Sequence, residues 1–230
     1  MKSFDSRPPL GQGSSVLQDS QSSDDELPLD LGPEKRKKPR HPPKPASTDE
    51  GVDLSHRSVL LFPGQGSQFV GMGKKLLGVP SVRELYAEAS QILGYDLLSM
   101  CLEGPAEKLN STRYCQPAIV VTSLAAVESL YHKNPEAVKL CVATAGFSVG
   151  EITALIFSGV LSLEDGLLLT KARGEAMEYA SQLEPSGMMT VFYGTKHQLG
   201  LACEAARKWT EDNGYAWPHG KPVFQVANYL

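Results

Sequence analysis

The stretch that decides the fold is CVATAGFSVGEITALIF (Cys141–Phe157). It places Ser148 between Gly146 and Gly150 at the end of an apolar run. The run predicts a buried strand over Leu140–Ala145, and the residues after the serine predict a helix. A serine at such a turn, with glycine two residues before and after it, is typical of a nucleophile elbow. We therefore predict that Ser148 is a nucleophile; the alternative is a tight turn whose serine only caps a helix.

The chemistry of a serine nucleophile sets further requirements. A serine hydroxyl reacts poorly at neutral pH, so it needs a base for its proton and hydrogen-bond donors for the oxyanion that forms. The first turn of the helix after Ser148 supplies N–H groups and a dipole that favours negative charge. A second donor has to come from another part of the chain.

A glycine-rich loop, Pro63–Ser67, comes directly after a second apolar run, Val59–Phe62. The run predicts a buried parallel strand, and the glycines let the loop backbone approach a ligand closely. A phosphate loop and an ordinary turn are the alternatives, and the lack of a GK[ST] ending disfavours nucleoside triphosphate binding. We therefore expect the second oxyanion donor in this loop.

Patterns along the rest of the chain predict helices separated by breaks. Pro117 is expected to open a long apolar helix that ends near His132. Ser162 is expected to cap a helix that ends near Tyr179. A further helix is expected over Lys196–Asp212, since its apolar residues share one face.

Composition and charge exclude several classes of protein. The net charge of -4 gives no basic footprint for nucleic acid. No apolar run reaches the roughly 20 residues that cross a bilayer, so we expect a soluble protein. The cysteines show neither a CxxC pair nor a Cys/His ligand spacing, so we interpret them as reduced core residues rather than metal ligands or a disulfide framework. They are Cys101, Cys115, Cys141 and Cys203.

Residues 1–55 differ in composition from the rest of the chain. They hold eight of the 16 prolines and a single aromatic residue, Phe4. Such a segment buries too little apolar surface to offset the entropy of ordering it, so we expect a disordered tail. Its basic run KRKKPR (Lys35–Arg40) is a candidate nuclear address or anionic-surface patch, and more often such a run is simply solvated. The many acidic residues of the tail argue against a transit peptide.

Several stretches resemble those of one family: LLFPGQGSQFVGMG, AGFSVGE, LTKARGEAM, GYDLL, CQPAI and SGMM. They are similar to the malonyl-CoA:acyl carrier protein transacylases, especially the mitochondrial form. The resemblance extends over about Arg57–Leu230, whereas residues 1–55 resemble nothing in that family. It implies ping-pong transfer of a malonyl group from coenzyme A to Ser148. The group then passes to the phosphopantetheine thiol of acyl carrier protein, for fatty acid synthesis.

The same resemblance implies roles for individual residues. Ser148 is the nucleophile, and the backbone N–H groups of Gln65 and Val149 form the oxyanion hole. Arg173 holds the malonyl carboxylate, a role that suits a planar fork of donors. Without the resemblance, Arg173 is interpreted as an ordinary helix residue on a solvated face. The family needs no cofactor and no metal, because malonyl-CoA is a substrate. The expected partners are acyl carrier protein and the coenzyme A thioester, and the implied location is mitochondrial, with the cytosol or nucleus left open by the tail.

The implied architecture is an α/β fold: an α/β-hydrolase-like parallel-sheet core with an inserted ferredoxin-like subdomain. Residues 56–185 correspond to part of the core, and residues 186–230 to the first half of the subdomain. Strand-like runs at Met188–Gly194 and Val223–Leu230 flank the predicted helix there and give a β-α-β unit. Because the core is expected to be incomplete, we also expect exposed apolar surface on its sheet.

The resemblance also implies a catalytic histidine farther along the chain than Leu230. The chain has five histidines, and none is a convincing substitute. They are His41, His56, His132, His197 and His219. One interpretation is therefore a malonyltransferase, and the other is a catalytically dead partial domain that at most binds coenzyme A or acyl carrier protein. A generic serine esterase is a third, because it would not need Arg173.

Overall fold

A computed structural model describes residues 57–183, 186–191, 196–214 and 223–227 of the chain. The chain divides into two units, Met1–Lys38 and Pro39–Leu230, and the first lies wholly outside the described residues. The predicted tail over residues 1–55 therefore lies outside the described residues too. Every described helix and strand belongs to the second unit.

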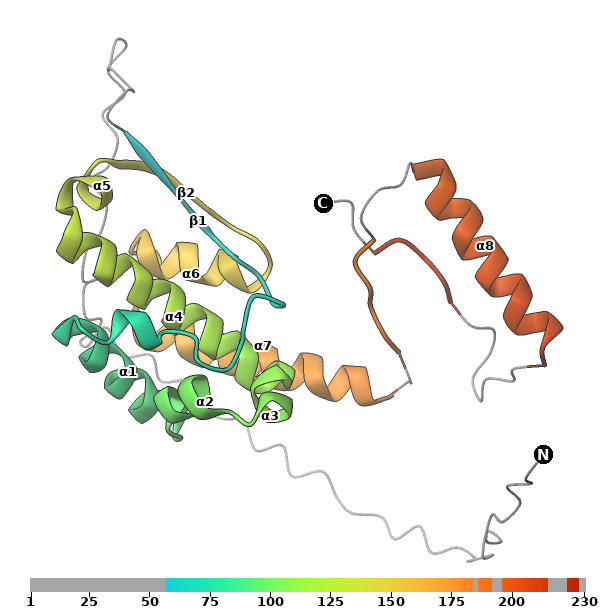
Figure 1. The fold of residues 1–230 in the computed structure, drawn as a ribbon, viewed down its shortest axis with the longest axis horizontal. Coiled ribbons are helices and arrows are strands. Elements are labelled where there is room, and N and C mark those ends of the chain that lie inside the picture. Colours follow the sequence, from blue (N-terminus) through green and yellow to red (C-terminus); the bar gives the residue numbers. More distant parts are fainter. Residues whose placement is uncertain (1–56, 184–185, 192–195, 215–222, 228–230) are drawn as a thin grey trace, which may run out of the picture. The chain divides into compact units, whose positions relative to one another are not determined.

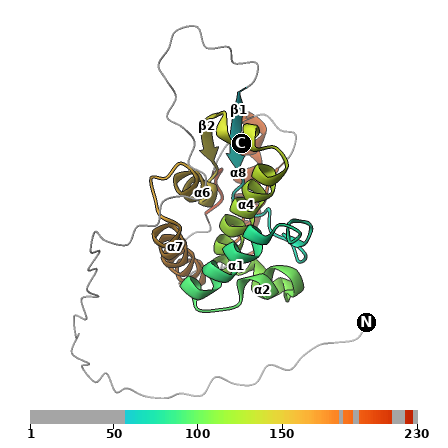
Figure 2. The ribbon, with the colours of Figure 1, turned by 90° about the vertical axis from the view of Figure 1, so that its left-hand side faces the viewer.

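Two parallel strands lie side by side in the described part of the sheet (Figures 1 and 2). They are β1 (Ser58–Phe62) and β2 (Cys141–Gly146), with Leu61 opposite Ala145 and Phe62 opposite Gly146. The positions of both predicted strands are thus confirmed. Because the strands are parallel, their carboxyl ends meet at one edge, and the segments after them come together there.

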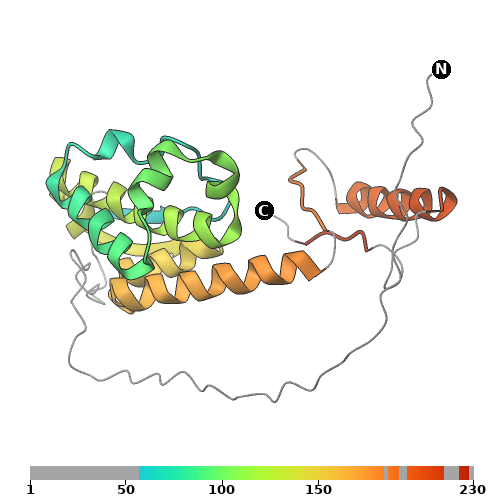
Figure 3. The same ribbon diagram turned by 90° about the horizontal axis from the view of Figure 1, so that it is seen from below.

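Helices pack around one central helix, α4 (Thr112–Lys133), which contacts α1, α6 and α7. In chain order, the helices of the described residues are η2 (Lys74–Leu76), α1 (Pro80–Leu93), α2 (Leu97–Glu103), α3 (Ala106–Asn110), α4, α5 (Pro135–Lys139), α6 (Val149–Phe157), α7 (Leu163–Leu183) and α8 (Lys196–Asp212). Figure 3 shows α7 as the long orange helix along one side of this bundle. The fold is an α/β arrangement with a parallel sheet.

The central position of α4 results from its sequence. Its buried residues, which include Ile119, Val120 and Val121, lie on all sides of the helix, and a helix that is apolar all round is a core helix. The predicted start at Pro117 is wrong, because the helix begins at Thr112 and Pro117 lies inside it. Proline is favoured in a first turn, but packing on several sides holds this helix together across the missing N–H.

One expectation about the strands is also wrong. Both apolar runs predicted buried strands, yet Val142 of β2 is 37% exposed. In β1, Val59 is 55% exposed and Leu61 is 75% exposed. Leu60 packs against the core, and Phe62 lies within it, so only one face of the strand is covered by described residues. Burial was predicted wrongly because a continuous apolar run does not reveal how many faces of a strand are covered. The expectation of exposed apolar surface on the sheet is confirmed.

The C-terminal region contains α8, whose predicted bounds are confirmed. The predicted flanking strands are not: residues 188–191 and 223–227 belong to no β-ladder, and the remaining residues of those runs lie outside the described part. A two-stranded pairing is marginal on its own, which is a physical reason for the difference. Among the described residues, no helix is both long and apolar enough to span a membrane.

Candidate active site

The turn between β2 and α6 holds Ser148 in an unusual backbone conformation. Its φ is 55° and its ψ is -112°, and no other non-glycine residue in the described part of the chain has a positive φ. Side chains rarely occupy this region, because Cβ crowds the backbone. The predicted strand, sharp turn and helix are therefore present, and the strain is located at the serine.

The two glycines of the motif are required sterically. A Cβ on Gly146 would lie 2.0 Å from the backbone of Gly150, and a Cβ on Gly150 would lie 2.3 Å from the carbonyl oxygen of Phe62. Both obstacles are backbone atoms, which cannot rotate away. The glycine spacing is thus what allows α6 to begin directly against the end of β1.

The start of α6 is organised for negative charge. The backbone N–H of Ser148 donates to Oε1 of Glu151 at 3.1 Å, which fixes the first turn. Val149, a predicted oxyanion donor, is the first residue of the helix and is buried. N–H groups at this position have no partner within a helix, and the helix dipole adds positive potential there.

Arg173 lies directly beside the serine. Its Nη2 donates to Oγ of Ser148 at 2.9 Å, and its Nη1 donates to Oε1 of Gln116 at 2.7 Å. Arg173 comes from the middle of α7, and both it and Ser148 are half-buried. The structure thus brings together two residues that the sequence predicted as site residues, although they are far apart in the chain.

Gln116 is a site residue that the sequence patterns did not indicate. It is fully buried in α4 and is polar where its neighbours are apolar. Its Nε2 lies 3.4 Å from Oε1 of Gln65 and 3.3 Å from the sulfur of Met177. A buried amide needs partners for both of its ends, and here the carbonyl end accepts from Arg173. The signal was available as a single glutamine within an apolar run.

The glycine loop after β1 lies against the elbow. A Cβ on Gly64 would lie 2.7 Å from the carbonyl oxygen of Phe147, so these two backbones are in close contact. Gln65 is exposed, and its Nε2 donates to Oγ1 of Thr112 at 3.4 Å. The backbone N–H of Gly66 donates to Oε1 of Gln68 at 2.8 Å. The loop expected to supply the second donor is therefore adjacent to Ser148, while the role of the Gln65 N–H stays a prediction.

In the described part of the chain, the histidine side chain lies away from the site, and no group of residues could form a metal site. His132 is exposed at the end of α4, about 24 Å along the helix axis from Gln116 at 1.5 Å per residue. The side chain of His197 and the residues His41, His56 and His219 lie outside the described part. Within that part, no cluster of His, Cys, Asp or Glu could hold a metal ion.

Two cysteines of the helical bundle, Cys101 and Cys115, are buried thiols. Burial raises the pKa of Cys115 to about 11, and the nearby carboxylate of Glu178 adds to the shift. Burial also raises the pKa of Cys101 to about 11. A thiol with a raised pKa holds little of the reactive thiolate at neutral pH. Both residues therefore pack as apolar side chains, as the sequence predicted.

Comparison with known proteins shows which sequences this chain is similar to. Residues 59–205 match the model of the acyl transferase domain. The mitochondrial malonyl-CoA-acyl carrier protein transacylase of Homo sapiens is 45% identical over 229 residues, which cover 99% of this chain and 53% of that protein. The chain thus spans about half the length of this relative.

Solved structures give the same result. An acyl carrier protein S-malonyltransferase from Vibrio cholerae is 33% identical, with a TM-score of 0.56 over 66% of this chain and 49% of that chain. A malonyl-transacylase in complex with a type II PKS acyl-carrier protein is 32% identical, with a TM-score of 0.54 over 66% of this chain and 49% of that chain. Both structures thus share with this chain the α/β fold with a parallel sheet.

Proposed function

Because the chain belongs to the acyl transferase domain family, we propose that it takes part in moving a malonyl group from malonyl-CoA to acyl carrier protein through an ester on Ser148. The hydrogen bond of 2.9 Å between Arg173 and Oγ of Ser148 is the observation that carries this proposal. It places a permanent cation next to the reacting oxygen, where a substrate carboxylate could reach it.

In the first half of the reaction, Oγ of Ser148 attacks the thioester carbonyl of malonyl-CoA. A serine ester forms, the C–S bond breaks, and the hydroxyl proton ends on the thiol of coenzyme A. The N–H groups of Val149 and Gln65 would stabilise the oxyanion, one from the start of α6 and one from the glycine loop. In the second half, the phosphopantetheine thiol of acyl carrier protein attacks the ester. A C–S bond forms, the C–O bond to Ser148 breaks, and the thiol proton ends on Oγ of Ser148.

Arg173 would select the acyl group by its charge. Its guanidinium already has one side on Gln116, so the group is oriented before substrate arrives. A malonyl group on Ser148 would present its free carboxylate to the guanidinium, and that pairing would replace the hydrogen bond to Oγ. A neutral acyl group would offer no such partner.

The larger frame of the proposal comes from the family. We assign residues 56–185 to part of an α/β-hydrolase-like core and residues 186–230 to part of a ferredoxin-like subdomain. No cofactor is needed, because the malonyl group, the serine and the two thiols complete the reaction. Mitochondria are the proposed location, since relatives such as the human protein carry that designation.

Mass spectrometry of the intact chain tests the proposal. Incubation with malonyl-CoA should add one malonyl group to Ser148, and Ser148→Ala should remove the adduct. Arg173→Ala should slow malonyl labelling by roughly 100-fold while acetyl labelling from acetyl-CoA changes little, because only malonyl carries a charge-assisted partner. Arg173→Lys should recover part of the malonyl rate.

Two results would contradict the proposal. One is the absence of any adduct from a sample that circular dichroism shows to be folded, which would favour a catalytically dead domain. The other is a preference for acetyl-CoA that Arg173→Ala leaves unchanged, which would favour a general serine esterase.

A further inference from the structure

The segment Asn110–Arg113, which joins α3 to α4, contacts the glycine loop. Oδ1 of Asn110 accepts from Nε2 of Gln68 at 3.0 Å, and Oγ1 of Thr112 accepts from Nε2 of Gln65 at 3.4 Å. Gln116 lies one helical turn later and holds Arg173. The position of this segment, which we term the α3–α4 junction, therefore bears on both the glycine loop and the arginine.

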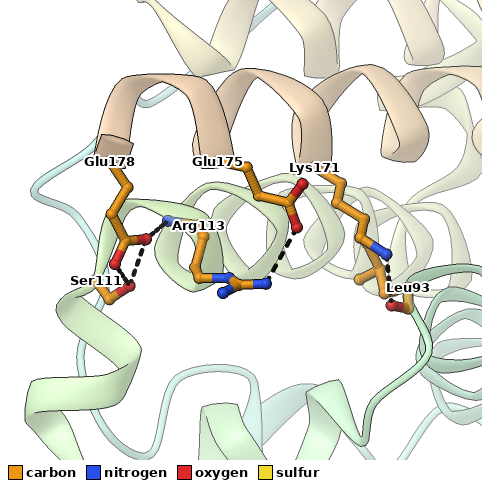
Figure 4. A network of polar contacts seen from close by, with 6 residues as sticks. All are labelled: Leu93, Ser111, Arg113, Lys171, Glu175 and Glu178. Carbon is orange, nitrogen blue, oxygen red and sulfur yellow. Dashed lines mark hydrogen bonds and ion pairs between the residues drawn. The ribbon is translucent and has the colours of Figure 1, made fainter. Parts of the chain in front are cut away.

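Glu178 of α7 binds the middle of this junction (Figure 4). Its Oε2 accepts from Oγ of Ser111 at 2.8 Å and from the backbone N–H of Arg113 at 3.0 Å, and its Oε1 lies 2.9 Å from the same Oγ. The side chain of Ser111 itself gives no cap to α4. A carboxylate from another helix thus takes the place of an N-cap, at the end where the helix dipole favours negative charge.

The same face of α7 approaches the junction closely at a second point. A Cβ on Gly174 would lie 3.0 Å from Cα of Arg113 and from the carbonyl oxygen of Thr112. Gly174 comes directly after Arg173, and Glu178 lies about one turn farther along α7. Close packing at Gly174 sets how near the two helices come, and the bonds of Glu178 fix their register.

We infer that Glu178 is a positioning residue: its carboxylate holds the α3–α4 junction, and through it Gln116 and the glycine loop, in the arrangement that orients Arg173 at Ser148. Glu178 touches neither of the reacting atoms, so its effect passes through Gln116 and Gln65. The role in acyl transfer rests on the proposed function, whereas the mechanical link can be measured without any reaction.

A neighbouring carboxylate on the same helix provides a matched control. Glu175 lies 3.1 Å from Nη2 of Arg113, but it binds the side chain of Arg113 and not the backbone (Figure 4). Both partners are substantially exposed, at 46% and 42%. Exposed pairs of this kind contribute little, because water and salt screen them. Loss of Glu175 should therefore leave the junction in place.

Hydrogen–deuterium exchange of the full chain tests the mechanical link. Glu178→Ala should raise the exchange of amides over residues 111–115 roughly tenfold, the size expected for a lost helix cap. It should also raise exchange in the Gly64–Gln68 loop, which a purely local cap would not reach. Glu178→Gln keeps an acceptor oxygen and should restore both segments, and Glu175→Ala should match the unmutated chain.

The labelling assay gives the second readout. Glu178→Ala should lower the ratio of malonyl to acetyl labelling rates by roughly tenfold, the factor for about one net hydrogen bond, with Glu178→Gln near the original ratio. Unchanged loop exchange in a folded Glu178→Ala chain would overturn the inference. So would an equal effect of Glu175→Ala, or failure of Glu178→Gln to restore the loop. If the unmutated chain takes no malonyl group, the proposed function fails, and the exchange data still decide the role of Glu178.

Discussion

The elbow at Ser148 and the contact between α4 and α7 fix the site in different ways. We term this contact the α4–α7 seam; it is formed by Arg113 and Gln116 of α4 with Arg173, Gly174 and Glu178 of α7. The elbow depends on backbone sterics, because an added Cβ on Gly146 or Gly150 would overlap main-chain atoms. The seam depends mainly on side-chain hydrogen bonds, such as the 2.7 Å bond between Arg173 and Gln116.

This difference fits the two roles that we propose for the site. Backbone sterics allow almost no adjustment, which suits a nucleophile that must stay in one place. Side-chain hydrogen bonds can exchange partners, which suits the proposed role of Arg173, in which it releases the serine when a carboxylate arrives. We therefore expect substitutions at the elbow to act on folding, and substitutions at the seam to act more on selectivity.

Gly150→Ala should have the largest effect on stability. Its Cβ would lie 2.3 Å from the carbonyl oxygen of Phe62 and 2.7 Å from that of Pro63, so the elbow has to distort. We expect a loss of about 3 kcal/mol or more in the free energy of unfolding, measured with urea. Gly78→Ala is the control, because nothing lies within 4 Å of its added Cβ, and it should stay within about 0.5 kcal/mol. Equal stability of the two variants would contradict the steric account.

The sequence predicted the elbow well because its signals are local. The glycine spacing lies within five residues, and an apolar run before it and a helical pattern after it complete the motif. Ser162 is similar: its Oγ accepts from the N–H of Asp165 at 2.9 Å, as the capping pattern predicted. Such features can therefore be recognised from a short stretch of sequence without knowledge of its tertiary contacts.

The seam could not be predicted in the same way. Gln116 and Arg173 meet because α4 and α7 pack together, and neither residue carries a local signal for that contact. Arg173 was identified by resemblance alone, and Glu178 is one of several acidic residues on its helix. The start of α4 was missed for a related reason, because tertiary packing tolerates Pro117 inside the helix.

Gln116→Leu should have an intermediate effect, since it removes the polar link of the seam and keeps the buried volume. We expect a loss of about 1–2 kcal/mol, because Nη1 of Arg173 loses its partner and the charge-assisted bond disappears. A double-mutant cycle with Arg173→Met should return a coupling of similar size. Gln91→Leu, on the exposed face of α1, is the control. Zero coupling would mean that Gln116 only fills space.

Ser148→Gly should act in the opposite direction. Glycine adopts positive φ without strain, so the substitution relieves about 1–3 kcal/mol of backbone strain. Part of this gain is offset, because glycine loses more conformational entropy on folding. We expect a net gain of about 1 kcal/mol in the free energy of unfolding, together with loss of the malonyl adduct. Ser148→Ala keeps the strain and should be close to neutral. Ser158→Gly is the control at a φ of -73°, where glycine should destabilise. A gain in both glycine variants would argue against strain at the elbow.

The smallest expected effect on stability comes from the buried thiol of Cys115, whose reactivity also tests whether its sulfur is enclosed. Burial raises the pKa of Cys115 from 9.0 to about 11, and the carboxylate of Glu178 adds to the shift. A raised thiol pKa means that the unfolded chain ionises first, so this contribution to stability is complete below pH 9 and is lost as pH rises through 11. Urea unfolding should therefore show no change from this thiol between about pH 7 and pH 9.

At about pH 8, iodoacetamide should modify the half-buried Cys203 well before Cys115, because the thiolate of Cys115 is scarce and its sulfur is enclosed. Equal rates in the folded chain would mean that the reagent reaches the sulfur of Cys115, which would contradict its burial in α4.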